Sequence, residues 1–484
     1  MENNMSSDVK HKFMGTEKIT KLLVQFSVPA VIGMLVNALY NIVDRIYIGN
    51  IKEIGHFAIA GVGLTFPVVI LSFAFAVLIG LGSGTNISLN LGRKKKEEAE
   101  CFLGNAIGYG IVVSVILMIL VLISMDSLVD LLGGSENTGI FTKQYLSIVA
   151  FGFPAAIIGY VANVGIRSDG NPRMSMATLL IGAIINIVLD PIFIFYFEMG
   201  VKGAALATII SQYASAAWTI FYFNSRFSGL KLYASNLIPK LKRIKDITMM
   251  GSAPFALQLG SSFVNYTYNS TLKIYGGDAS IGAMAIIQGI VIFLAMPIFG
   301  INQGVQPILG YNYGARLYGR VKEALFKAIF AATAICVVAF ITTQFLSKYF
   351  IFIFTREQEI LDIAINGLRI NTIMFPIIGF QIISSVYFQA VGKPKLSLFI
   401  SLSRQIIILI PCIKIMGKLF GLTGIWFSAP VADFLSTLLT YLLIKREMRI
   451  LKEQLRKRHK ELVKSKVEGR LLEEEEIELK AKID

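Results

Sequence analysis

Residues 183–195 read AIINIVLDPIFIF, an apolar run interrupted by one carboxylate, Asp190, and by Asn186 four positions before it. Four residues of an α-helix exceed one full turn by about 40°, so the two polar side chains share one face. An ionisable group inside an apolar membrane helix is costly and usually faces a bundle interior or the path of an ion or substrate. The stretch therefore predicts a membrane helix that carries a functional acid.

The composition of the chain is that of a polytopic membrane protein. Of its 484 residues, 55% are hydrophobic and 16% are charged, with a mean hydropathy of +0.65, whereas about 25% of the residues of soluble domains are charged. Apolar runs of roughly 20 residues recur along nearly the whole length. We therefore predict an all-α membrane bundle, which excludes a large soluble catalytic domain and an outer-membrane barrel.

Cysteines and histidines give no sign of a metal or redox centre. The three cysteines stand singly in separate apolar segments, and the three histidines lie in terminal or loop stretches. Without CxxC or histidine spacing, neither a cofactor nor a cluster is expected. The net charge of +15 is concentrated in short loops and a C-terminal tail, which indicates membrane orientation and not nucleic-acid binding.

Apolar spans and their charged or Gly/Pro-rich breaks predict twelve transmembrane helices. Their centres lie near residues 34, 68, 112, 152, 186, 213, 260, 295, 334, 374, 405 and 433. Every second connection is basic, and the alternate connections are short or acidic. By the positive-inside rule, the basic connections and both termini are cytoplasmic, as in a multi-pass protein of the cytoplasmic membrane.

The chain also repeats itself. SDGNPRMSM (168–176) recurs as AVGKPKLSL (390–398), and residues 89–99 are matched by residues 310–320 at nearly the same spacing. Because each repeat holds six helices, the repeats are parallel and are related by an axis along the membrane normal. The predicted parts are an N-terminal segment (1–18), an N-lobe (19–223), a linker (224–246), a C-lobe (247–444) and a charged tail (445–484).

Matched prolines, Pro29 and Pro254, stand inside the first and seventh predicted helices. Proline removes a backbone hydrogen bond and permits a kink, which suits a helix that bends during transport. A proline that is merely tolerated is an equally good interpretation of either position alone. The tail is expected to continue from the last helix as a basic amphipathic stretch near anionic headgroups, with no role in transport chemistry.

Four ionisable side chains lie clearly inside predicted helices: Asp44, Asp190, Arg404 and Asp433. At 1.5 Å per residue, Asp44 and Asp190 lie roughly 8 and 12 Å below the outer boundary, and Thr208 lies at about 8 Å. Three helices of the N-lobe thus bring Asp44, Asn186, Asp190 and Thr208 to one level. We expect a proton or sodium site there.

The chemistry of this set supports that expectation. Two carboxylates in a low-dielectric pocket cannot both ionise comfortably, so one of them takes up a proton or shares a hard cation. Hydroxyl and carboxamide oxygens complete an oxygen shell for sodium. The structural alternative is that Asp44 pairs with Arg45, that Asp190 caps a break before Pro191, and that the Thr208 hydroxyl bonds within its own helix.

In the C-lobe, Arg404 and Asp433 are expected roughly 12 and 16 Å from the cytoplasmic side. An unpaired charge at either position would be expensive, so we favour a structural ion pair. Tyr40 and Asn37 lie one and two turns before Asp44 and are candidates for lining the same cavity, although each taken alone is more often explained by ordinary helix packing.

The motifs resemble those of one transporter family. NALYNIVDRIYIGN, AIAGVGLTFP, GSGTNISLNLG, GNPRMSM, NIVLDP and GVKGAALAT follow in the order and spacing of the multidrug and toxic compound extrusion (MATE) transporters, over about residues 15–445. The resemblance implies two six-helix lobes around a central cavity. It also implies a secondary active transporter, not an enzyme, that exports lipophilic and often cationic drugs in exchange for sodium or protons.

By the same resemblance, Asp44, Asn186, Asp190 and Thr208 match the N-lobe cation site of the family. Asn37, Tyr40 and, more weakly, Asn163 match substrate-cavity positions. Family members with a C-lobe cation site carry acids in helices seven and ten, whereas this chain has none there, and Asn269 stands at the position that corresponds to Asp44. Coupling through the N-lobe is therefore favoured.

Two rivals remain open at this point. One is a lipid-linked saccharide flippase of the same superfamily, which would need several cavity arginines or lysines, and the other is a scaffold that uses the charged tail. For the favoured antiporter, the expected partners are drugs and membrane lipid, without nucleic acid, and we expect a monomer.

Overall fold

A computed structural model describes residues 11–51 and 55–467 of the chain. All the regular elements assigned within these residues are helical. Residues 11–16 form one helical turn and a half. The α-helices of the first half of the chain are α2 (Ile19–Gly49), α3 (Gly55–Leu64), α4 (Phe66–Gly92), α5 (Lys96–Ile123), α6 (Met125–Leu131), α7 (Glu136–Val149), α8 (Phe153–Ser168), α9 (Pro172–Pro191) and α10 (Gly200–Asn224).

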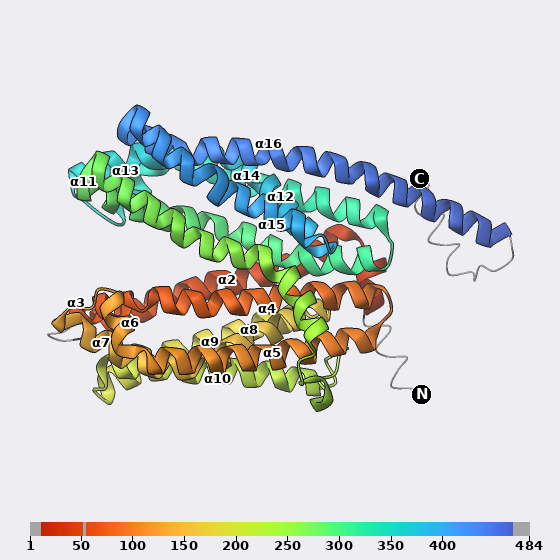
Figure 1. Cartoon of the computed structure of the whole chain (residues 1–484), viewed down its shortest axis with the longest axis horizontal. Coiled ribbons are helices and arrows are strands. Elements are labelled where there is room, and N and C mark those ends of the chain that lie inside the picture. Colours follow the sequence, from red (N-terminus) through yellow and green to blue (C-terminus); the bar gives the residue numbers. More distant parts are fainter. Residues whose placement is uncertain (1–10, 52–54, 468–484) are drawn as a thin grey trace.

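The second half is built in the same way. Its α-helices are α11 (Leu241–Gly314), α12 (Tyr318–Phe352), α13 (Gln358–Asn371), α14 (Phe375–Ala390), α15 (Pro394–Leu402) and α16 (Ile410–Val467). Two π-helical segments, η2 (Ile192–Tyr196) and η4 (Ser403–Leu409), follow α9 and α15, and two 3-10 turns are η1 (Ala150–Gly152) and η3 (Ala234–Asn236). Figure 1 shows the red-to-yellow helices as one lobe and the green-to-blue helices as the other.

The number of predicted membrane spans exceeds the number of long helices among the described residues. Among the described residues, nine helices are long and apolar enough to cross a membrane, or ten if α13 and α14, which bend by 56°, form one span. Inside α11 and α16, Gly277 (φ 63°) and Gly421 (φ 60°) leave the helical region. Since each of these long helices changes direction at its glycine, α11 holds two predicted spans, and α16 holds one span together with the end of the span that begins in α15. The total of twelve stays a prediction.

The internal repeat is visible in the breaks of the helices. The spans expected around residues 152 and 374 are each interrupted immediately before a Phe-Pro pair, Phe153-Pro154 and Phe375-Pro376, and these pairs occupy equivalent positions of the two repeats. Proline lacks an N–H and disfavours helical geometry in the residue before it, so a new helix starts at each pair. Corresponding helices of the two repeats therefore break at corresponding places.

The helix bounds can be compared with the expected linker and tail. The linker expected over 224–246 is shorter, because α11 begins at Leu241 and carries its basic first turns beyond the apolar span. The tail expected from residue 445 continues from the last helix as expected, because α16 runs through residue 445 to Val467. Residues 1–10 of the N-terminal segment and the acidic end of the tail, 468–484, lie outside the described residues.

The two lobes meet along a seam of glycines. A Cβ atom on Gly82 of α4 would collide with the carbonyl of Ile247, and one on Gly251 of α11 would collide with the carbonyl of Leu78. Near the end of α4, a Cβ on Gly92 would collide with the carbonyl of Tyr311. Only glycine lets two helix backbones approach so closely. The seam therefore fixes how tightly the lobes contact each other.

The basic loops gather at one end of the bundle, where ion pairs and capping contacts join them. Arg243 of α11 pairs with Glu98 of α5 at 3.2 Å, and the Lys231 backbone N–H donates to Glu100 Oε1 at 2.9 Å. In the other lobe, Lys393 Nζ lies 2.5 Å from Glu447 Oε1. We refer to this end as the basic end, and by the positive-inside rule we expect it to face the cytoplasm.

Candidate functional site

Asp190 and Asn186 lie near the end of α9, where the sequence ends the regular helix. Asn171 caps the start of α9 by accepting from the Met174 N–H, and Pro191 ends its α-helical part before the wider π turn of η2. Asp190 is 0% exposed and Asn186 is 1% exposed. The Asn186 amide Nδ2 donates to Asp190 Oδ1 at 3.3 Å. The amide and the carboxylate thus form one buried polar unit.

Asp44 of α2 faces this unit. Its carboxyl group lies within direct interaction range of the Asp190 carboxyl group. Three oxygens of the cluster are buried without a hydrogen-bond partner, namely Asp44 Oδ1, Asn186 Oδ1 and Asp190 Oδ2. Buried polar atoms are nearly always satisfied, so three unsatisfied acceptors side by side are unusual. Because all three atoms are hydrogen-bond acceptors, a cation or a proton can bind between them and supply the missing positive charge.

Thr208 of α10 contacts Tyr145 of α7, which lies close to the acids. The Thr208 hydroxyl donates to the Ala204 carbonyl at 3.0 Å, as in the structural alternative, and its oxygen retains a free lone pair. The buried Tyr145 hydroxyl interacts with Thr208 and lies within electrostatic range of Asp44 and Asp190. Tyr145 is not among the sequence candidates, because its segment reads as an ordinary apolar span.

The expected cavity residues have different surroundings. Tyr40 is half-buried and lies within electrostatic range of both acids. Asn37 is exposed, and its side chain accepts from Asn41 Nδ2 at 3.2 Å. Asn163 is buried and exchanges two hydrogen bonds with Ser175, at 2.7 and 2.9 Å. Asn163 therefore joins α8 to α9, and both the N–H donor and the oxygen acceptor of its side chain already have partners.

Arg404 and Asp433 are in contact in the C-lobe. Arg404 Nε donates to Asp433 Oδ1 at 2.6 Å, and Asp433 is 2% exposed. Arg404 lies in the π segment η4, where the wider turn shifts the register of side chains relative to an α-helix. A paired arginine leaves little positive charge to bind an anionic substrate.

Arg167 is a further buried charge, which the sequence pattern places in a basic loop. It lies in the last turn of α8 and is 4% exposed. Its Nη1 donates to Gln303 Oε1 of α11, across the lobe boundary, while Nη2 is buried without a partner. From the sequence this burial is not expected, because Arg167 begins the segment RSDGNPR, whose Gly and Pro are typical of an exposed loop.

Comparison with known proteins decides the family. The MatE family model matches residues 29–192 and 255–413, and each matched segment lies within one lobe. The chain belongs to the MatE family. This MATE transporter is therefore a membrane transporter and not an enzyme, and its two lobes are the two matched units of the family.

Individual relatives cover nearly the whole chain of this MATE transporter. It is 29% identical over 426 residues to the multidrug export protein MepA of Staphylococcus aureus strain MRSA252, which covers 88% of this chain and 93% of MepA. MepA of Staphylococcus saprophyticus is 28% identical over 429 residues, with the same coverage. A solved structure described as the outward-facing conformation of a multidrug resistance MATE family transporter has a TM-score of 0.86, with 25% identity, 91% coverage of this chain and 98% of the other.

Proposed function

We propose that this MATE transporter exports lipophilic, often cationic compounds, and that sodium or proton binding at Asp44, Asn186 and Asp190 drives the export. The observation that carries the proposal is the set of three unsatisfied buried oxygens on these residues. Relatives of similar length are named multidrug export proteins, which supports the choice of substrate class.

The acids couple the ion to the substrate through charge. Without a bound cation or proton, two facing carboxylates repel each other and attract a cationic drug. Uptake of a cation or proton removes this charge, so the acids attract each other through the shared ion and the cavity loses its attraction for the drug. The drug and the driving ion thus compete for the same negative charge.

Pro29 is the position at which α2 can bend when the charge at Asp44 changes. It is buried inside α2, about four turns before Asp44, which corresponds to about 22 Å along the helix axis. The missing N–H of proline weakens the helix at this turn. A change of charge at Asp44 alters the packing of α2 against α9, and bending at Pro29 transmits that change towards the basic end.

Alternating access also needs the lobes to part at the basic end. In this structure α4 and α11 are in backbone contact along the glycine seam. Opening of the cytoplasmic side has to separate this seam, while closure on the other side brings the outer parts of the lobes together.

The test measures transport of a fluorescent cation in proteoliposomes that contain the variants Asp190→Asn or Asp44→Asn. Asparagine keeps the size of the side chain but removes the charge, so we expect export of a fluorescent cation to fall to background under either an imposed sodium gradient or an imposed pH gradient. Asp278→Asn, in the acidic connection between the two parts of α11, serves as control. Wild-type export rates in Asp190→Asn would refute the coupling role, and the gradient that drives wild-type export identifies the ion.

The flippase alternative is less well supported by these residues. Recognition of a diphosphate group calls for several free arginine or lysine side chains in the cavity. Arg404 is bound to Asp433, and the acids at the candidate site would repel such a ligand. Drug export therefore remains the favoured proposal.

A further inference from the structure

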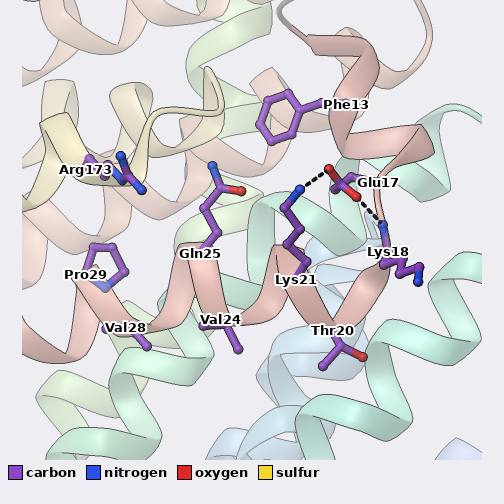
Figure 2. A pocket seen from close by; sticks show the side chains of 10 residues that line it. All are labelled: Phe13, Glu17, Lys18, Thr20, Lys21, Val24, Gln25, Val28, Pro29 and Arg173. Atoms are coloured by element: carbon purple, nitrogen blue, oxygen red, sulfur yellow. Dashed lines mark hydrogen bonds and ion pairs between the residues drawn. The ribbon is translucent and has the colours of Figure 1, made fainter.

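A groove opens on α2 close to the basic end. It has a volume of about 960 Å³ and is lined by the helical turn before α2, by the first three turns of α2 and by the start of α9 (Figure 2). The lining residues are Phe13, Glu17, Lys18, Thr20, Lys21, Val24, Gln25, Val28, Pro29 and Arg173. None of the acids of the candidate ion site belongs to it, so the groove is a separate feature.

The groove is charged at one end and apolar along its length. Two adjacent rows of α2 side chains line it, one with Lys21, Gln25 and Pro29 and the other with Thr20, Val24 and Val28, and Figure 2 shows Arg173 facing the first row from another helix. Val24 is 58% exposed and Val28 is 49% exposed. From Lys21 to Val28 the axis of α2 advances about 10 Å into the membrane region.

The charges favour an anion. The lining holds three cationic side chains, Lys18, Lys21 and Arg173, and one carboxylate, Glu17. Lys21 Nζ lies 2.6 Å from Glu17 Oε2, and this hydrogen bond holds the pKa of the Glu17 carboxyl below its usual range. Arg173 is exposed. A lipophilic cation would be repelled here, whereas a phosphate next to arginine and lysine is the preferred arrangement.

The apolar row of α2 continues beyond the groove. Ile32, Leu39, Ile42 and Ile46 are all more than 40% exposed and extend the row along the rest of α2. An acyl chain that starts at the groove therefore finds an apolar surface along the whole helix. Basic pockets between membrane helices on the cytoplasmic side are typical sites for anionic lipid headgroups.

We propose that this groove binds one anionic phospholipid, with its headgroup phosphate between Lys21 and Arg173 and an acyl chain along Val24 and Val28. Binding draws Lys21 from Glu17 to the phosphate. Since Pro29 also lines the groove, the lipid contacts α2 at the turn where the helix is weakest, and its presence favours one bend of α2 over another.

The experiment is native mass spectrometry of the full-length protein in detergent, incubated with equal amounts of phosphatidylglycerol and phosphatidylcholine that have matched acyl chains. Wild type is expected to retain phosphatidylglycerol in preference to phosphatidylcholine. Each basic residue near a headgroup contributes roughly fivefold to retention, so Lys21→Gln/Arg173→Gln should lose about 25-fold. Glu17→Gln, which frees Lys21, should increase retention of phosphatidylglycerol.

The matched control is Lys242→Gln/Lys395→Gln, which removes two exposed charges at the same end of the C-lobe, Lys395 being the counterpart of Arg173 in the second repeat. It should retain phosphatidylglycerol like wild type. The proposal fails if the control loses as much lipid as the groove variant, or if the groove variant loses none. It also fails if excess inorganic phosphate displaces the phosphatidylglycerol, because the site then recognises phosphate without the acyl chain.

Discussion

Gly92 and Gly314 pack against each other's helices across the boundary between the lobes. A Cβ on Gly92 would collide with the carbonyl of Tyr311, and a Cβ on Gly314 would collide with the carbonyl of Leu89. Each glycine ends the same motif of its own repeat, LNLG in the first and YNYG in the second. The contact is thus made by equivalent positions that face each other across the repeat axis.

Glycine to alanine in the seam should open the basic end. Gly251→Ala places a methyl group against the Leu78 carbonyl, and overpacking of this kind costs about 1–3 kcal/mol, so we expect the population open at the basic end to rise about tenfold. Distances between spin labels at Lys94 and Lys322, in a background without native cysteines, measure this opening.

The control for the seam is Gly289→Ala in the same helix. A Cβ at Gly289 meets nothing within 4 Å, so the spin-label distances should remain those of wild type. Identical distance distributions for Gly251→Ala and wild type would show that the seam does not limit the closure of the basic end.

Tyr145→Phe should weaken ion binding without unfolding the protein. It removes one hydroxyl beside Thr208 and the two acids, and a hydrogen bond of this kind contributes about 1 kcal/mol, so the ion concentration for half-maximal transport should rise about fivefold. Tyr213→Phe, whose hydroxyl donates to the Phe151 carbonyl at 2.9 Å, is the control. An unchanged ion dependence in Tyr145→Phe would remove this tyrosine from the site.

The Arg404–Asp433 pair should behave as a stabilising contact. Asp433→Asn leaves the partly buried arginine without its anion, which costs about 3 kcal/mol and should lower the midpoint of thermal unfolding by several degrees. The double variant Arg404→Met/Asp433→Leu should recover most of the loss, because it leaves no charge behind. A double variant less stable than the single one would argue for a role of the charges in the transport cycle.

The protection of residues 14–18 from amide hydrogen exchange should depend on Arg320. Arg320 Nη2 donates to the Glu17 carbonyl at 2.6 Å and to the Met14 carbonyl at 3.2 Å, while His11 Nε2 lies 2.8 Å from Asp169 Oδ1 in the other lobe. In Arg320→Met we expect amide hydrogen exchange of residues 14–18 to accelerate about tenfold or more, since hydrogen bonds to charged groups contribute about 1.5–3 kcal/mol. Lys322→Met, an exposed change in the same helix, should leave the exchange unchanged.

Much of the architecture follows from local rules. Apolar spans and basic loops predict an all-α bundle, and the internal repeat predicts two similar lobes, because both features can be read from short stretches of the sequence. The geometry of Asn186 and Asp190 follows in the same way from their spacing on one helix. Their placement opposite Asp44 required an estimate of depth, and the structure brings the three residues together.

Other features depend on contacts that the sequence does not reveal. Tyr145 becomes a neighbour of the acids only when α7 packs against α10, and Arg167 is buried where it donates to Gln303 of the opposite lobe. His11 reads as a terminal residue, yet it is 5% exposed and contacts Asp169. The glycines of the seam are common in membrane helices, so their pairing appears only in three dimensions.

Beyond Gly421, α16 runs without a further break and extends past the end of the C-lobe. Glu447 is bound to Lys393 of the same lobe and Leu451 is 1% exposed, so this part of the helix moves with the C-lobe, while the helix continues to Val467. From residue 445 to residue 467 the helix extends about 33 Å, and a rotation of the lobe by about 10° therefore displaces the tip by about 6 Å relative to the base. A fluorophore near residue 460, far from the transport pathway, would thus report lobe rotation as a change in its distance to a second label on the N-lobe.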